Sequence, residues 1–374
     1  MRVSFHNFSD LHPVGVKDEA TKRFVQIMEQ NSFIEGAYNQ QFEQKFALSQ
    51  QAKHCMLVAN GTDALELCLR AYDVGPGDPV GIPSVSFFAT AEAVVNVGAH
   101  PVFIDVDPKT CLMDPESLKR ALNGPKLKAI IPVHLYGMPA PIKELEVICQ
   151  PCGTHIIEDA AQAHGTCHQP GRVIGDSNNL VTYSFYPTKN LSAFGDAGAI
   201  VTNDTSLVDK IVMLRNHGRT PSGHALIGYN SRCDHLQAAI LDLKLDQLPS
   251  LTQKRREVAR RYCQGLSSLE RIRFMPKRFV DLSSWHLFPI LLPSSQERDS
   301  LRAYLGKCEI DTALFYQKAL CDELTLSQYN GEGDAGREFC GTTISLPLHP
   351  FLTNDQVDYV IEMVSKWEQQ ETNG

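Results

Sequence analysis

The 374-residue chain lacks long apolar runs, an excess of basic charge and any recognisable metal-binding motif. No window approaches the roughly 18 uninterrupted apolar residues of a membrane span. Residues 1–6 are not followed by the apolar segment of a signal peptide, so we expect a cytoplasmic protein. The net charge of −8 argues against nucleic acid or an anionic membrane as the main partner. A local pocket of hydrogen-bond donors could still hold a phosphate.

Cysteine and histidine are present without the spacing of a metal site. Of the 11 cysteines, only Cys149 and Cys152 form a C-x-x-C pair, and no second pair follows at zinc-ribbon spacing. The 13 histidines contain no H-E-x-x-H pattern. Because a reducing cytoplasm keeps thiols free, we expect unpaired cysteines and no metal.

Strand and helix patterns alternate along the first two thirds of the chain. The predicted strands lie at 54–58, 101–105, 127–133, 155–158, 181–184 and 199–202, with another short strand that follows the turn at 75–79 and ends at Pro83. The predicted helices lie at 16–31, 62–72, 87–97, after Asp114, after Asp204 and at 234–248. This alternation predicts an α/β fold with a mainly parallel sheet between helices.

The pattern changes near residue 250, where a basic helix at 254–264 leads to a mixed segment with a strand at 285–292. We therefore predict a large domain, residues 1–249, which includes the N-terminal segment. A smaller C-terminal α+β domain, residues 250–374, follows it. Ligands of open parallel sheets bind beyond the carboxyl ends of the strands, so the residues at those ends are the candidates for function.

The first two candidates follow the strand at 54–58 and the short strand that ends at Pro83. Residues 60–63 (NGTD) could hold a phosphate through backbone N–H groups and the Thr62 hydroxyl. A plain helix cap is the simpler interpretation. Phe87 could stack on a flat cofactor, although packing in the core is the ordinary role of an aromatic residue.

The third segment, EDAAQAH at 158–164, begins with acids and continues with small residues that let a flat ring approach closely. Asp159 could pair with a protonated pyridine nitrogen, and Gln162 could donate a hydrogen bond to a ring hydroxyl. An ordinary capping acid is the alternative.

The fourth segment, SFYPTKN at 184–190, places Lys189 among apolar and proline neighbours. Burial lowers a lysine pKa, and a neutral amine is what forms a Schiff base. The alternative is a lysine whose stem lies along the surface. Ser184 is placed to help hold a phosphate, and Gly195 and Gly198 allow a tight turn. The four segments together supply the parts of a site for pyridoxal 5'-phosphate (PLP).

Their order resembles the DegT/StrS-type nucleotide-sugar aminotransferases, a branch of the fold-type-I PLP enzymes, over nearly the whole chain. The resemblance implies a seven-stranded, mostly parallel sheet. The motifs that carry it are GTDAL (61–65), GPGD (75–78), PVFIDVD (101–107), VHLYGMPA (133–140), EDAAQAHG (158–165), SFYPTKN (184–190), GDAGA (195–199), LRNHGR (214–219), GYNSR (228–232), LQAAIL (236–241) and SLPLHP (345–350).

The resemblance implies that Lys189 anchors PLP covalently and shuttles the proton, and that Asp159 pairs with the pyridine nitrogen. The implied cofactor-binding residues are Gly61, Thr62, Phe87, Asp159, Gln162, Ser184, Lys189 and Asn230. Asn230 is expected to reach the cofactor phosphate of a neighbouring subunit, so a homodimer with shared active sites is implied. Residues expected to contact the substrate are His164, Tyr186, Arg232 and Tyr316.

The implied reaction passes the amino group of L-glutamate to PLP, and the pyridoxamine phosphate (PMP) form then aminates a dTDP- or UDP-linked keto-hexose. LRNHGR and GYNSR are more similar to branches that act on 3-keto sugars. Surface polysaccharide synthesis, including O-antigen, or antibiotic sugar synthesis is the expected pathway. The stretch LFYQ at 314–317 departs from the family's His-Tyr-Pro, which bears on substrate placement.

Three alternatives remain at this point. The first is a 4-keto sugar aminotransferase, and the second is a sugar dehydratase or cyclitol aminotransferase of the same branch. The third is a non-enzymatic regulator that kept the fold. The presence of Lys189, Asp159 and Gln162 argues against the regulator, because function depends on the site rather than on the fold.

Overall fold

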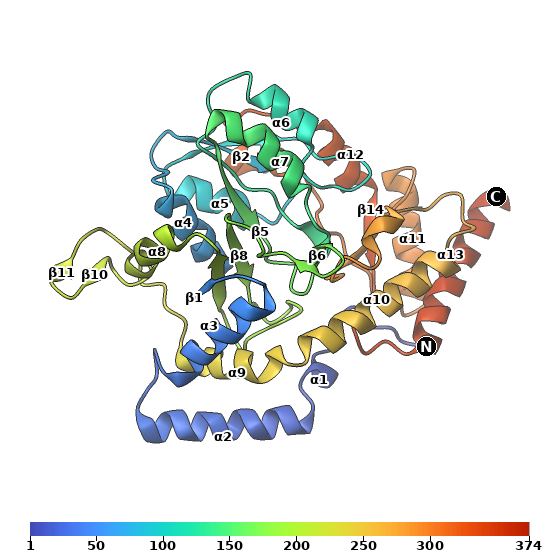
Figure 1. Ribbon diagram of the computed structural model, residues 1–374. Helices are drawn as coiled ribbons and strands as arrows, with labels where there is room; N and C mark the ends of the chain where they lie inside the picture. The colour runs from blue at the N-terminus through green and yellow to red at the C-terminus, as the bar shows by residue number, and fades with distance from the viewer. Residues whose placement is uncertain (374) are drawn as a thin grey trace.

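A seven-stranded sheet forms the centre of the larger part of the molecule (Figure 1). The computed structural model describes residues 1–373. The strand order is β1-β9-β8-β5-β4-β2-β3, and only β9 runs antiparallel to its neighbours. The strands are β1 (His54–Val58), β2 (Pro79–Pro83), β3 (His100–Ile104), β4 (Ala129–Ile130), β5 (His155–Asp159), β8 (Leu180–Ser184) and β9 (Gly198–Thr202).

Helices cover both faces of this sheet. They are α3 (Ala37–Ser49), α4 (Gly61–Ala71), α5 (Ala89–Asn96), α6 (Pro115–Ala121), α7 (Ile142–Cys149), α8 (Val208–Leu214) and α9 (His235–Leu245). The N-terminal helices α1 (Phe8–Leu11) and α2 (Val14–Gln30) lie outside these layers, and α2 packs on α9 (Figure 1). Successive strand residues point to opposite faces, so Tyr183 packs with α3 and α9 while Leu180 packs on the side of α4, α5 and α8. The predicted α/β fold is confirmed.

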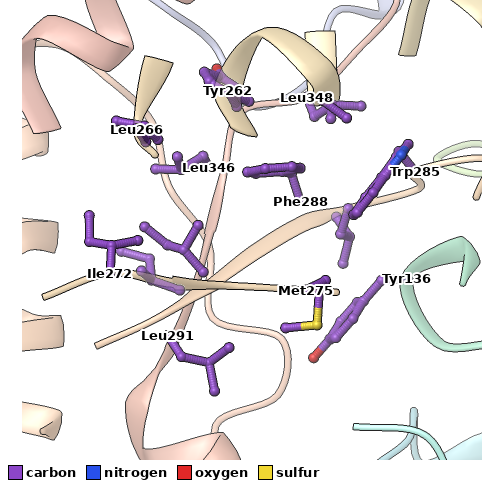
Figure 2. Close-up of a cluster of buried hydrophobic side chains, with 14 of the residues drawn as sticks. Tyr136, Tyr262, Leu266, Ile272, Met275, Trp285, Phe288, Leu291, Leu346 and Leu348 are labelled. Carbon is purple, nitrogen blue, oxygen red and sulfur yellow. The ribbon is translucent and has the colours of Figure 1, made fainter. Parts of the chain in front are cut away.

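A second core forms beyond α9. A three-stranded antiparallel sheet, β12 (Arg273–Phe274), β13 (Phe288–Leu291) and β14 (Thr343–Leu346), packs with α10 (Leu248–Gly265), α11 (Ser295–Lys307), α12 (Asp334–Thr342) and α13 (Asn354–Asn373). Figure 2 shows the Tyr136 ring within the apolar cluster of this core, on the side of Met275. Tyr136 therefore extends from the segment after β4 into the second core.

The predicted boundary at residue 250 lies inside α10, which runs without a break from the large part to the small one (Figure 1). The N-terminal segment also crosses this boundary: the Val3 N–H donates to the Glu309 carbonyl at 3.0 Å, and the Asp311 N–H donates to the Val3 carbonyl at 2.9 Å. The division into two domains at this position stays a prediction.

Several elements differ from their predicted extents. The strand expected at 127–133 is reduced to β4, because Pro132 has no N–H to continue the ladder, and Val133 returns only as a single bridge to Asp159. Asp204 caps a 3-10 turn that leads into α8 rather than α8 itself. Hairpins β6–β7 (Cys167–Gln169, Arg172–Val173) and β10–β11 (Arg219–Thr220, Gly223–His224) were not predicted. None of the helices in residues 1–373 has the length and apolarity of a membrane span.

Candidate active site

The carboxyl ends of β1, β5 and β8 lie at one edge of the sheet, and predicted site residues stand at each of them. Asp159 ends β5 and Ser184 ends β8. Gly198, the first residue of β9, pairs with both Val58 of β1 and Ser184. A Cβ added to Gly198 would lie 2.4 Å from the Asn60 carbonyl oxygen, so only glycine permits this close approach.

A phosphate cradle is formed where β1 passes into α4. Asn60 caps α4, its Oδ1 accepting the Asp63 N–H at 2.8 Å. The N–H groups of Gly61 and Thr62 stand in the first turn, where helical N–H groups have no partner within the helix. A Cβ on Gly61 would lie 2.7 Å from the Ser184 Cβ. The structure thus brings Gly61, Thr62 and Ser184 together in an arrangement that suits a phosphate.

Asp159 is buried and held by two donors. Its Oδ2 accepts the Thr90 hydroxyl at 2.9 Å, and its Oδ1 accepts the Ala161 N–H at 3.1 Å. Ser86 lies 2.7 Å from the Thr90 oxygen and supports it in turn. An ionised carboxylate has about four acceptor positions, so Asp159 keeps capacity for a pyridinium N–H. Thr90 was not predicted, and its only signal was its place three residues after Phe87.

Lys189 is half-buried in the turn that follows β8, where its backbone N–H donates to the Tyr186 carbonyl at 2.8 Å. Burial lowers the pKa of the Lys189 ammonium to about 8, and the charge of Asp159 opposes this by raising it. A lysine that loses its proton near neutral pH has the reactivity required for covalent attachment of a carbonyl cofactor. The structure places Lys189 and Asp159 close enough for their charges to interact.

Gln162 is oriented from two sides. Its Oε1 accepts the Tyr136 N–H at 2.7 Å, and its Nε2 donates to the Tyr316 hydroxyl at 2.9 Å. Tyr136 adopts the left-handed φ of 59°, and its hydroxyl donates to the Phe315 carbonyl. The second Nε2 hydrogen of Gln162 remains for a ring hydroxyl. Tyr136 belongs to the VHLYGMPA motif but was not predicted as a site residue.

Aromatic side chains flank this edge of the sheet. Phe87 is 58% exposed, so the core-packing alternative is wrong for this residue. Its ring centroid lies 6.4 Å from that of Tyr316, at 39° between the planes. Tyr186 is 51% exposed. These rings are available to stack on a planar cofactor or to pack against a sugar.

One predicted substrate contact, His164, is placed differently from the expectation. His164, expected to touch the substrate, is fully buried between Tyr183 and Phe185, with ring centroids 5.4 and 5.5 Å away. Burial and, secondly, the charge of Lys189 lower its pKa to about 3. The expectation for His164 is wrong in this structure, because aromatic rings separate its imidazole from solvent.

Asn230 and Arg232 bond to each other rather than to the Lys189 turn. Asn230 is exposed, and its Oδ1 accepts the Arg232 Nη2 at 2.6 Å. No interaction within residues 1–373 brings Asn230 to the phosphate cradle. The role of Asn230 in the cofactor site of a second subunit stays a prediction, and so does the contact of Arg232 with the substrate.

The residues present fit PLP. The cradle of Gly61, Thr62 and Ser184 matches its phosphate, buried Asp159 matches its ring nitrogen, and the low-pKa Lys189 matches its aldehyde. Together with the mostly parallel sheet, this site defines a PLP-dependent enzyme of fold type I.

The family model described as the DegT/DnrJ/EryC1/StrS aminotransferase family matches residues 15–365, so the chain belongs to this family. The predicted family, fold, cofactor and enzyme class are therefore confirmed: the protein is a PLP-dependent aminotransferase.

The similarity to known proteins covers nearly the whole chain. A pleiotropic regulatory protein of Geobacillus stearothermophilus is 37% identical, covering 94% of this chain and 95% of its own. A dTDP-3-amino-3,4,6-trideoxy-alpha-D-glucose transaminase of Streptomyces venezuelae is 36% identical, covering 94% and 93%. The crystal structure of NtdA from Bacillus subtilis, with bound cofactor PMP, is 27% identical with a TM-score of 0.90, covering 99% and 86%.

Proposed function

We propose that this enzyme transfers the amino group of L-glutamate to C3 of a dTDP- or UDP-linked keto-hexose, as a cytoplasmic homodimer in polysaccharide or antibiotic sugar synthesis. The observation that carries the proposal is a lysine of lowered pKa, Lys189, within reach of the charge of Asp159 at the sheet edge. It occurs in a chain 36% identical to a relative named as a dTDP-3-amino sugar transaminase. The LRNHGR and GYNSR motifs favour the 3-keto position.

PLP, when bound, supplies the electron sink for the reaction. The first-turn N–H groups of Gly61 and Thr62 and the Ser184 hydroxyl bind its phosphate. Asp159, oriented by Thr90 and Ala161, would accept a hydrogen bond from the protonated ring nitrogen. These groups fix the position of the reacting atoms, which is the protein's main contribution in a cofactor enzyme.

Lys189 is the proton carrier. Its Nζ, with a pKa of about 8, can accept a proton from the donor's α-carbon and return it at neutral pH. Gln162 and Tyr316 hold one another by their hydrogen bond and limit where the substrate can stand. Exposed Phe87 and Tyr186 offer apolar surface for a hexose ring. Tyr316 thus takes part in substrate placement although the neighbouring His and Pro of the family motif are absent.

The test is a panel of dTDP- and UDP-linked 3-keto and 4-keto hexoses, each incubated with holoenzyme and isotope-labelled L-glutamate. We expect labelled amino sugar from a 3-keto substrate by mass spectrometry, with release of 2-oxoglutarate. Lys189→Ala is the control and should give none. Amination at C4 would support the 4-keto alternative, and failure with every keto-hexose of the panel would refute amino transfer from L-glutamate to these sugars.

A further inference from the structure

A small cavity adjoins Lys189 on the side of the N-terminal segment and the second core. Its volume is about 30 Å³. Its polar lining includes His6, Lys189, Arg255, His286 and His349, and no aspartate or glutamate stands among the lining residues of the described chain. The cavity lining therefore contains cations and imidazoles but no carboxylate of its own.

Arg255 is the main charge in this lining. Its Nη1 donates to the backbone carbonyls of Trp285 and Leu348, both at 3.1 Å, so neither bond neutralises it. Burial lowers the pKa of Arg255 only to about 10, and the guanidinium stays charged at neutral pH. A half-buried cation without a carboxylate partner is costly unless a ligand supplies the anion.

His349 provides the second, independent observation. It is 7% exposed, and its Nδ1 is buried without a hydrogen-bond partner. Burial, then the charge of Arg255, lower its pKa to about 4. Burial likewise lowers the pKa of His286 well below its ordinary value, with Lys189 and Arg255 acting in the same direction. Both rings are neutral at pH 7, so each can turn an N–H donor toward an anion.

The size of the cavity selects the anion. A single water needs about 10–15 Å³ of such volume, so 30 Å³ admits a group of two or three heavy atoms. A carboxylate has this size and matches the fork of a guanidinium. The diphosphate of a nucleotide is larger than this volume.

We infer that this cavity binds a carboxylate of the amino-acid donor, with Arg255 as its charged partner and His349 as a neutral donor. The inference rests on the proposed function, since it assigns one substrate of that reaction to a place beside Lys189. The carboxylate held there would bring the α-amino group of glutamate to the same edge of the sheet as Asp159 and the phosphate cradle.

The experiment measures binding of glutarate, an unreactive dicarboxylate, to the holoenzyme by calorimetry, with inorganic pyrophosphate as the parallel probe. Arg255→Gln should weaken glutarate binding roughly ten- to a hundredfold, the range for hydrogen bonds to a charged group, and raise the KM for glutamate. The KM for the sugar nucleotide should stay unchanged. Arg255→Lys should recover only part of the affinity, because it keeps the charge and loses the fork.

Arg256→Gln is the matched control. This neighbouring arginine also donates to backbone carbonyls, those of Gly165, Leu282 and Ser283, but does not line the cavity. His349→Phe is the second variant and should also weaken glutarate binding, so it keeps the test possible if Arg255→Gln fails to fold. Equal glutarate affinity in wild-type, Arg255→Gln and His349→Phe would overturn the inference, as would an effect on pyrophosphate alone.

Failure of this inference and failure of the proposed function are distinguishable, because glutarate binding requires no turnover. Arg255-dependent glutarate binding in an enzyme that aminates no sugar would leave the cavity assignment standing and overturn the acceptor. Sugar amination with a glutamate KM that Arg255→Gln does not change would leave the proposed function standing and overturn the cavity assignment.

Discussion

Capture of PLP by the apoenzyme should follow the ionisation of Lys189, with a midpoint near pH 8 instead of the ordinary 10.5. Only the neutral amine attacks the cofactor aldehyde. At about pH 7.5, a pKa of about 8 leaves roughly a quarter of the lysine neutral, against about one part in a thousand for an ordinary lysine. The buried position of Lys189 therefore increases the reactive fraction roughly 200-fold at that pH.

Asp159→Asn sharpens this prediction, since the charge of Asp159 raises the pKa of Lys189 while burial lowers it. Removing the charge should move the midpoint to lower pH. Thr90→Val, which removes a hydrogen bond to Asp159 and no charge, should leave the midpoint near that of the wild type.

The assay is stopped-flow absorbance after mixing apoenzyme with PLP across the alkaline range. Each rate is divided by that of PLP with Nα-acetyl-lysine at the same pH, which removes the ionisations of PLP itself. A wild-type midpoint near 10.5, or an upward shift in Asp159→Asn, would show that burial does not control this amine.

Further predictions concern the cradle, the second subunit and a buried cation. Gly61→Ala should weaken PLP retention in equilibrium dialysis at least about tenfold, since its Cβ would lie 2.7 Å from the Ser184 Cβ in the phosphate site; unchanged retention would contradict the cradle. Asn230→Ala should weaken PLP retention only modestly, because the phosphate keeps its contacts with the subunit whose lysine anchors the cofactor; complete loss would mean that the phosphate site has been misjudged. Lys244 is 4% exposed, and its Nζ donates to the Ser192 carbonyl and hydroxyl, both at 2.7 Å. Lys244→Met should lower the free energy of unfolding in urea by about 1–3 kcal/mol, because those acceptors lose their donor; an unchanged midpoint would contradict this.

The site residues that could be predicted from the sequence are those that stand at the carboxyl end of a buried strand. Asp159 and Ser184 each close a buried strand, and residues at such ends meet at the ligand edge of a parallel sheet whatever the remaining chain does. His164 stands in the same motif as Asp159, yet its ring turns into the aromatic layer beside Tyr183. Nothing in the spacing of the motif distinguishes a side chain that faces the ligand from one that faces α3.

Residues that reach the site through tertiary packing were missed for a different reason. Thr90 of α5 contacts Asp159 from 69 positions away in the sequence. Tyr136 orients Gln162 only through a left-handed backbone that a non-glycine residue seldom adopts. Periodicity reports the buried face of an element and not its neighbour across the core.

The same reasoning explains why the cavity beside Lys189 could not be predicted. Arg255 and His349 belong to the C-terminal part, and His6 belongs to the N-terminal segment. Arg255 lies on α10, the helix that joins the two parts, and its two carbonyl acceptors come from beyond β12 and β14. In sequence it is one of two adjacent arginines in a basic helix, and the pattern alone assigns both to solvent. Both arginines are partly buried by the packing of the second core, but only Arg255 reaches the cavity beside Lys189. Donor recognition therefore depends on the contact between the two parts rather than on either motif set by itself.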